Sequence, residues 1–318
     1  MRQHPAAPIA VWAALLLMFG LPVQAAPDYR LEPRQIAPDT WLVEGRTENF
    51  SKDNGGDIVN VVFLATDAGV LVIDTGPSRR YGEALRAAIA RVTDAPVRRV
   101  LLTHHHPDHV LGNQAFADVP IAALAGTARL MADEGDAMAE NMYRLVGDWM
   151  RGTEVVLPDE ALEPGVLAFG GHRLRLLALQ GHTGADLAIL DETTGVLFAG
   201  DLIFHDRALT TPHTPGIDAW LADLDRLGAL AWSLVVPGHG PIARDDGPLR
   251  QTADYLRWLD RTFTEAAARG ADMNEVMQSP IPTRFADLPL ARYELIRSTN
   301  HLYPRYEGAQ FRLLAPAP

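Results

Sequence analysis

Thr103-His104-His105-His106-Pro107-Asp108-His109 is the stretch that decides the fold of this chain. It follows Val97-Arg98-Arg99-Val100-Leu101-Leu102, whose β-branched and aliphatic residues predict a buried strand, so the polar cluster begins where a strand ends. Alternate residues of an extended segment point the same way, so His104 and His106 can face one metal ion while the aspartate and the last histidine turn towards another. The spacing predicts half of a two-metal site, and a solvated polar loop is the plain alternative.

The composition is that of an ordinary globular protein, with 318 residues, 47% of them hydrophobic and 21% charged. No linker rich in Ser, Gly or Pro interrupts the pattern, so we expect one large domain over residues 27–318. The chain has no cysteine, which excludes disulfides and thiolate ligands and leaves nitrogen and oxygen as the metal donors.

Residues 1–26 have the pattern of a secretory signal peptide. Arg2 precedes an apolar run, residues 9–21, that is short for a membrane span, and small residues then offer a cleavage site after Ala25 or Ala26. We therefore expect a periplasmic protein with no stable membrane anchor after processing, and an uncleaved anchor is the alternative.

The net charge argues against nucleic acid as a partner. The formal charge is −12 for the whole chain, and loss of Arg2 with the leader makes it −13. A field of that sign repels phosphate backbones, and Lys52 is the only lysine.

Hydrophobic periodicity predicts an alternation of strands and helices. The expected strands span residues 39–45, 58–65, 69–73, 97–102, 119–124, 166–169, 172–179, 187–191, 195–199 and 233–236. The expected helices span residues 81–91, 127–149, 218–231, 248–269 and 290–303. The order of strands, helix, strands, helix occurs twice, and two such halves facing each other would place the sheets inside and the helices outside.

Two segments allow more than one interpretation. Residues 46–57, rich in Asn, Gly and charge, predict a mobile loop that can act as a flap over the metals. The helix at 127–149 carries an apolar stripe, which we interpret as core, with a substrate wall as the alternative. The stripe consists of Met138, Met142, Leu145, Val146 and Trp149.

Further candidate ligands follow later apolar strands. His182, Asp201 and His239 each come directly after a glycine, and Asp74 ends the strand at 69–73. Glycine lets backbones approach closely, which helps to bring several strand ends around one point.

With these motifs in this order, the chain resembles the metallo-β-lactamase superfamily over nearly all of residues 27–318. The resemblance implies an α+β fold, the four-layer αββα sandwich, and a single hydrolase domain after the leader. It implies two Zn²⁺ ions, with iron or manganese as alternatives. The implied ligands are His104, His106 and His182 for the first metal, Asp108, His109 and His239 for the second, and Asp201 as a bridge.

The resemblance also assigns other roles. Asp74 would orient a ligand rather than bind metal, and His105 is no ligand in the family pattern. Asp108 is the expected catalytic residue, since it can also orient the attacking water.

Departures within the superfamily narrow the branch. Class B1 and B2 β-lactamases use a cysteine where this chain has Asp201, and an aspartate there resembles glyoxalase II and the broader hydrolases. Flavodiiron oxidoreductases carry an acidic residue at the position of His106, which disfavours that branch. Persulfide dioxygenases keep the ligand set but use one iron, so that alternative stays open.

A narrower likeness lies in residues 72–82, 141–150 and 301–304. These stretches resemble the exported SoxH-like hydrolases called quinoprotein relay system zinc metallohydrolases. That likeness implies a functional link to a quinoprotein dehydrogenase and to alcohol oxidation that depends on pyrroloquinoline quinone.

The expected activity is hydrolysis of a small-molecule acyl substrate, namely an ester, thioester, lactone or amide. Two metal ions can share a water and lower its pKa from 15.7 to roughly 7, which makes hydroxide available near neutral pH. An iron oxidoreductase of the persulfide-dioxygenase type and a metal- or cofactor-binding protein without turnover are the rival functions.

Four other histidines in residues 27–318 lie outside these motifs. His205 and His213 lie in the segment after Asp201, where we expect surface histidines, with substrate contact as the alternative. His172 and His301 are expected to be structural.

Overall fold

The structure is a computed structural model that describes residues 28–314, without the side chains of residues 311–314. The predicted signal peptide lies outside the described residues. Within residues 28–314, no helix has both the length and the apolar character needed to cross a bilayer.

Two sheets form the centre of the molecule. The first sheet contains, in spatial order, β1 (Arg34–Ala37), β2 (Thr40–Val43), β3 (Val61–Thr66), β4 (Gly69–Ile73), β5 (Val97–Leu101), β6 (Ile121–Leu124) and β7 (Glu160–Leu162). The second sheet contains, in spatial order, β12 (Leu234–His239), β11 (Val196–Phe204), β10 (Asp186–Asp191), β9 (His172–Leu179) and β8 (Gly165–Phe169).

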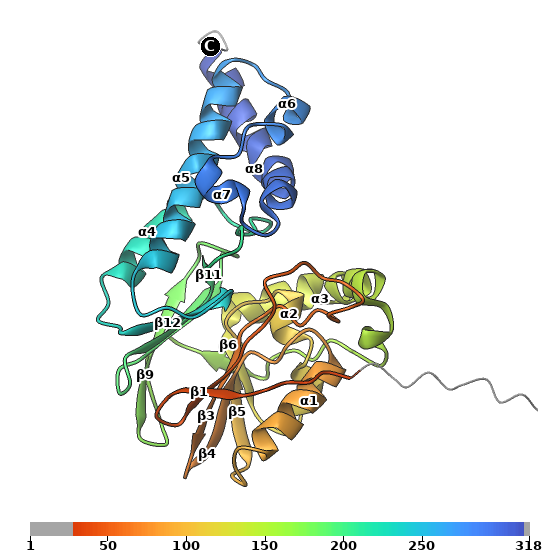
Figure 1. Cartoon of the computed structure of the whole chain (residues 1–318), viewed down its shortest axis with the longest axis vertical. Helices are drawn as coiled ribbons and strands as arrows, with labels where there is room; N and C mark the ends of the chain where they lie inside the picture. The colour runs from red at the N-terminus through yellow and green to blue at the C-terminus, as the bar shows by residue number, and fades with distance from the viewer. Residues whose placement is uncertain (1–27, 315–318) are drawn as a thin grey trace, which may run out of the picture.

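The helices flank these sheets. The α-helices are α1 (Arg79–Ala90), α2 (Pro107–Val110), α3 (Ala125–Val146), α4 (Ile217–Gly228), α5 (Gly247–Ala268), α6 (Met273–Met277), α7 (Thr283–Ala286) and α8 (Ala291–Leu314). Two short 3-10 helices are η1 (Asn113–Phe116) and η2 (Gly147–Met150). In Figure 1, α5 to α8 gather at the upper end of the molecule and α1 lies against the first sheet at the lower end.

Side-chain alternation along the strands creates the layers. In β3, Val62 and Leu64 join the core between the two sheets, while Val61 and Phe63 join the core beneath α1. The core between the sheets also contains Phe198 of β11 and other residues of the second sheet. Helix, sheet, sheet and helix therefore stack as four layers, which confirms the predicted αββα sandwich.

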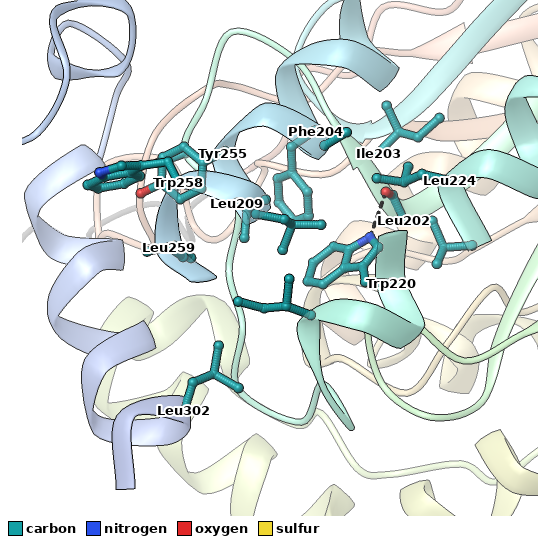
Figure 2. Close-up of a cluster of buried hydrophobic side chains, with 14 of the residues drawn as sticks. Leu202, Ile203, Phe204, Leu209, Trp220, Leu224, Tyr255, Trp258, Leu259 and Leu302 are labelled. Atoms are coloured by element: carbon teal, nitrogen blue, oxygen red, sulfur yellow. Dashed lines mark hydrogen bonds between the residues drawn. The ribbon is translucent and has the colours of Figure 1, made fainter. Parts of the chain in front are cut away.

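A third core lies between the second sheet and the C-terminal helices. Figure 2 shows the Trp220 side chain of α4 beside Leu202, Phe204 and Leu209, in one apolar cluster that continues to residues of α5 and α8. Its indole Nε1 donates a hydrogen bond of 2.9 Å to the carbonyl oxygen of Leu202. This core fixes the C-terminal helices against the strand that carries Asp201.

Several element boundaries differ from the sequence prediction. β11 continues to Phe204 instead of ending at residue 199, so Asp201 lies inside a strand rather than after one. Its pairing with β12 shifts register near Gly200, and this irregularity lets the strand continue past the ligand. α8 extends well beyond residue 303 and contains Pro304. The prediction missed β1, β7 and the short helices, which have too few residues for a clear period.

The interpretation of the apolar stripe on α3 is only partly right. Met142 and Val146 are buried and pack with Leu111 and Met150 in a small core. Leu145 is 37% exposed and does not belong to that core. The helix ends at Val146, and η2 carries the chain onward.

The segment 46–57 has no helix or strand, but side chains from elsewhere hold it in place. The Tyr29 hydroxyl donates to the carbonyl oxygen of Gly55 at 2.7 Å, and Trp149 Nε1 donates to that of Lys52 at 2.8 Å. Expected as a mobile loop, this segment is thus anchored at both Gly55 and Lys52. The role of this segment as a flap stays a prediction. Deletion of the segment should change the Michaelis constants.

Candidate metal centre

The first four candidate donors come from one short segment after β5. His104 and His106 lie in the extended chain that follows the strand, and α2 then begins at Pro107, which suits the first turn of a helix. Asp108 and His109 lie within α2. The change from extended chain to helix turns the second pair of donors away from the first pair.

The other three donors come from the second sheet. His182 follows β9, Asp201 lies within β11, and His239 is the last residue of β12. Two neighbouring glycines are required by the geometry. Gly200 has a φ of +52°, and a Cβ at Gly238 would lie 1.9 Å from Asp201 Oδ1.

His104, His106, His182 and Asp201 form one group of converging donor atoms. His106 Nδ1 lies 3.0 Å from His182 Nε2. Asp201 Oδ2 lies 3.4 Å from His182 Nε2 and 3.8 Å from His104 Nε2. These separations are those expected of ligands around one tetrahedral ion, whose bonds to nitrogen and oxygen are about 2.0–2.2 Å long.

Asp108, His109 and His239 form a second group of the same kind. Asp108 Oδ2 lies 3.3 Å from His239 Nε2. Asp201 also reaches this group, with Oδ1 3.2 Å from His109 Nε2 and Oδ2 3.3 Å from His239 Nε2. The structure thus brings all seven predicted donors together, with Asp201 between the two groups. We call these seven residues the cradle, and none of them is more than 8% exposed.

The inward-facing atoms of the cradle fit a divalent metal. Within the described residues, His104 Nε2, His109 Nε2 and Asp201 Oδ1 are buried and have no hydrogen-bond partner. Buried polar atoms are nearly always paired, so a cluster of unpaired donors facing one another indicates an ion.

The outward-facing imidazole nitrogens support the same conclusion. The His239 Nδ1 proton goes to the carbonyl oxygen of Ile58 at 2.7 Å, and His104 Nδ1 lies 3.0 Å from the Thr103 hydroxyl. His109 Nδ1 donates to Asp74 Oδ2 at 2.8 Å. Metal-binding histidines usually donate the second ring proton in this way, because it fixes the tautomer that offers the other nitrogen to the metal.

Asp74 is built to orient His109 and not to bind metal. Its carboxylate accepts the Thr103 backbone N–H at 2.8 Å and the Thr103 hydroxyl at 2.7 Å, besides the His109 proton. Its φ of +61° is uncommon for a residue other than glycine. Such strain persists only where the surrounding contacts enforce it, and it is common at functional sites.

The electrostatics of the cradle keep the three histidines of the first group neutral and Asp201 ionised. Burial keeps the pKa of His104 and His106 well below the usual value and lowers that of His182 to about 3, so these imidazoles are neutral. Burial alone would raise the pKa of Asp201, but the nearby His239 and His109 hold it well below its usual range. Burial also lowers the pKa of His109, yet the carboxylates around it raise it well above the usual value. A divalent cation between these groups would replace the positive charge of protonated His109 beside the carboxylates, and His109 could then bind it as a neutral imidazole.

The remaining histidines divide into two kinds. His205 Nδ1 donates to the carbonyl oxygen of Pro241 at 2.7 Å, and His172 Nδ1 pairs with Asp191 at 2.8 Å, so neither of these ring nitrogens is directed at a cradle donor. His213, expected at the surface, instead lies 2.8 Å from His106 Nε2 through its own Nδ1. No spacing or periodicity marks that contact, because the two residues are 107 positions apart.

Two facing sheets with a buried cluster of imidazoles and carboxylates between their strand ends define a metal-binding αββα protein. The chain belongs to the metallo-beta-lactamase superfamily, whose family model matches residues 54–239. A hydroxyacylglutathione hydrolase from Acidiphilium cryptum is 29% identical over 77% of this chain and 92% of that protein. The acyl-coenzyme A thioesterase MBLAC2 from Gallus gallus is 25% identical over 63% of this chain and 79% of that protein.

A solved structure supports the fold. A metallo-beta-lactamase from Pontibacter korlensis superposes with a TM-score of 0.59 at 24% identity, covering 72% of this chain and 99% of that chain. The superfamily is one of metallohydrolases, and the His and Asp groups of the cradle suit divalent metal ions.

Proposed function

We propose that this chain is a dinuclear zinc hydrolase of acyl compounds, and that the seven cradle residues hold the two ions. The observation that carries the proposal is the position of Asp201, whose two oxygens lie within 3.2–3.4 Å of donors from both groups. One carboxylate shared in this way suits a pair of ions better than two independent sites. A donor set of nitrogen and oxygen without thiolate is compatible with zinc, iron or manganese.

The chain's own residues supply binding, orientation and exclusion of water. Divalent ions held by the cradle would act as Lewis acids and make a water acidic enough to attack a carbonyl near neutral pH. Asp108 Oδ2 lies 3.3 Å from His239 Nε2, and the other oxygen of this carboxylate would accept a hydrogen bond from that water and orient it. Burial of the cradle strengthens every charge interaction within it.

An acyl compound is the proposed substrate class. Both relatives described above are named for hydrolysis of acyl compounds, of glutathione in one case and coenzyme A in the other. The test is a screen of esters, thioesters, lactones, amides and β-lactams against purified protein and its His106→Ala variant. We expect cleavage of at least one class, lost together with metal in the variant. Less than one equivalent of metal in the purified protein, with metal content and acyl cleavage unaltered in His106→Ala, would contradict the proposal.

An iron oxidoreductase of the persulfide-dioxygenase type is the main rival, because it would use the same donors. Elemental analysis and an oxygen electrode separate the two functions. Zinc with acyl cleavage supports the hydrolase, whereas iron with thiol-dependent oxygen uptake supports the rival. Two bound zinc ions without turnover of any acyl class would favour a binding protein.

We also propose export to the periplasm and a link to a quinoprotein dehydrogenase. The leader pattern of residues 1–26 supports export, and the likeness of residues 72–82, 141–150 and 301–304 to quinoprotein relay system hydrolases supports the link. The mature N-terminus of periplasmic protein should lie at residue 26 or 27. A deletion strain should grow poorly on primary alcohols, and normal growth there would remove the link without affecting the hydrolase proposal.

A further inference from the structure

A row of three side chains, those of His106, His213 and Glu134, leads from the cradle to the surface. His106 Nε2 lies 2.8 Å from His213 Nδ1, and His213 Nε2 lies 3.1 Å from Glu134 Oε2. The His213 and Glu134 side chains are 34% and 37% exposed, so the row of side chains reaches solvent. The three residues come from the segment after β5, the segment after β11 and α3.

The orientation of His106 determines which ring nitrogens of His106 and His213 carry protons. Its Nδ1 faces the cradle, 3.0 Å from His182 Nε2, and must be free of a proton to bind a metal. The proton of the neutral ring is then on Nε2, which donates to His213 Nδ1. His213 in turn carries its proton on Nε2, which lies 3.1 Å from Glu134 Oε2, so the carboxylate stabilises the tautomer of His213 that accepts from His106.

The backbone of His213 shows that its position is imposed. Its φ is +83°, a conformation that costs free energy for any residue with a side chain. The surrounding segment, residues 205–216, is fastened to α8. Arg305 donates to the carbonyl oxygen of Pro215 at 2.6 Å, and Thr211 donates to Ser298 at 3.0 Å. α8 therefore holds the segment that presents His213 to the cradle.

We propose that His213 and Glu134 are positioning residues that fix the tautomer and orientation of His106 and thereby strengthen metal binding at the first group. The inference rests on the proposed metal pair and names two residues that act on it from outside the cradle. Outer partners of this kind typically contribute about 10–100-fold to metal affinity. Glu134 acts through His213, so its contribution is the smaller one.

The same residues do not make a third metal site. His105, His106 and His213 form a third group of converging donor atoms, and Glu134 Oε2 lies 3.6 Å from the buried His105 Nε2, so another cation at this point is the competing interpretation. A cation on His213 Nε2 would force the proton of that ring onto Nδ1, where it would face the proton on His106 Nε2. Two donors cannot share one hydrogen bond.

The experiment compares His213→Gly and His213→Asn with the parent protein. Glycine removes the side chain without strain at a φ of +83°, and asparagine also tolerates this region while keeping an oxygen near the position of Nδ1. His205→Asn on the same segment and Glu140→Gln on α3 are the matched controls, since neither side chain contacts the cradle. Metal affinity is measured by competition with a chromophoric chelator, and ligand geometry by the visible spectrum of the Co²⁺ form.

We expect His213→Gly to weaken one of two metals about 10–100-fold and to alter the Co²⁺ spectrum, with partial rescue in His213→Asn and a smaller loss in Glu134→Gln. Chelator-treated variants should unfold at the parent's urea concentration, which excludes a folding defect. Two metals bound as tightly as in the parent, with an unchanged spectrum, would overturn the inference alone. A third equivalent of metal that the parent binds and His213→Gly loses would overturn the inference in favour of a cation site at His213. A parent protein that binds no metal would overturn the proposed function itself.

Discussion

The cradle and the C-terminal helices α5 to α8 position their residues by different means. Cradle donors lie on or directly beside paired strands and the short α2, so backbone hydrogen bonds of the sandwich set their positions. The segment 205–216 contains no helix or strand, and side chains of α8 hold it through hydrogen bonds to its backbone and side chains. All seven cradle residues lie within the region that matches the family, residues 54–239, while α5 to α8 lie outside it.

We therefore expect the cradle to determine metal binding and turnover, and the C-terminal helices to modify stability and metal affinity. Loss of a cradle donor should have the largest effect on metal binding and turnover, whereas changes in the C-terminal helices should alter stability or the strength of one site. Two aromatic residues link the regions. The Trp220 ring lies 5.0 Å from the His182 ring, and the Phe204 ring stacks on the His239 ring at 5.3 Å.

The largest expected effect is that of Asp201→Asn. The amide keeps the volume but removes the charge and one of the two acceptors shared between the groups. We expect weakened binding of both metals and a loss of more than about 100-fold in kcat/KM, since even outer partners of metal ligands contribute up to that amount. Metal content by elemental analysis and acyl cleavage measure the effect. Retention of two metals with parental activity would show that Asp201 does not bridge.

Trp220→Ala should cost about 3–5 kcal/mol of unfolding free energy, because it empties a fully buried indole site. Trp258→Ala in the same core is the control, since Trp258 packs against Tyr255 and Phe285 and touches no donor. Both variants should lose comparable stability in urea unfolding, but only Trp220→Ala should also weaken the metal bound by His182. Equal effects on metal affinity would erase the distinction between the two regions.

Asp74→Asn should weaken metal binding about 10–100-fold by loosening His109. Asparagine tolerates the positive φ of this position, so the backbone is retained. Asp191→Asn provides the matched pair, because Asp191 accepts from His172 Nδ1 at the same 2.8 Å but no metal ligand is involved. Chelator competition should distinguish the two variants, and an equal loss of affinity in both would contradict the role assigned to Asp74.

The smallest effect concerns Asp57 in the anchored segment 46–57. Burial raises its pKa to about 6 from an ordinary value of 3.8, so between about pH 4 and 6 the folded state keeps a proton that the unfolded state has lost. Stability therefore falls as pH rises through this window. Asp57→Asn lacks that fall and should gain about 1–2 kcal/mol over the parent on going from pH 4 to pH 7.5, since the carboxyl is partly exposed. Urea unfolding of the metal-free proteins at both pH values measures this gain. A difference in unfolding free energy between variant and parent that is the same at pH 4 and pH 7.5 would refute the raised pKa of Asp57.

Much of the site could be predicted from the sequence because its donors have distinctive chemistry and stand at strand ends. His104, His182 and His239 illustrate this, since each follows or ends an apolar run. The continuation of β11 past Asp201 could not be predicted, because it depends on a register shift with β12. His213 could not be predicted either, because its partner is distant in sequence and its orientation comes from a strained backbone that α8 holds.

The most direct test of the central claim is the metal content of purified protein after dialysis against metal-free buffer, combined with anomalous diffraction to locate the ions. The account predicts two divalent ions per chain, one beside His104, His106 and His182 and the other beside Asp108, His109 and His239. A single ion, or ions bound elsewhere while the cradle stays empty, would contradict it.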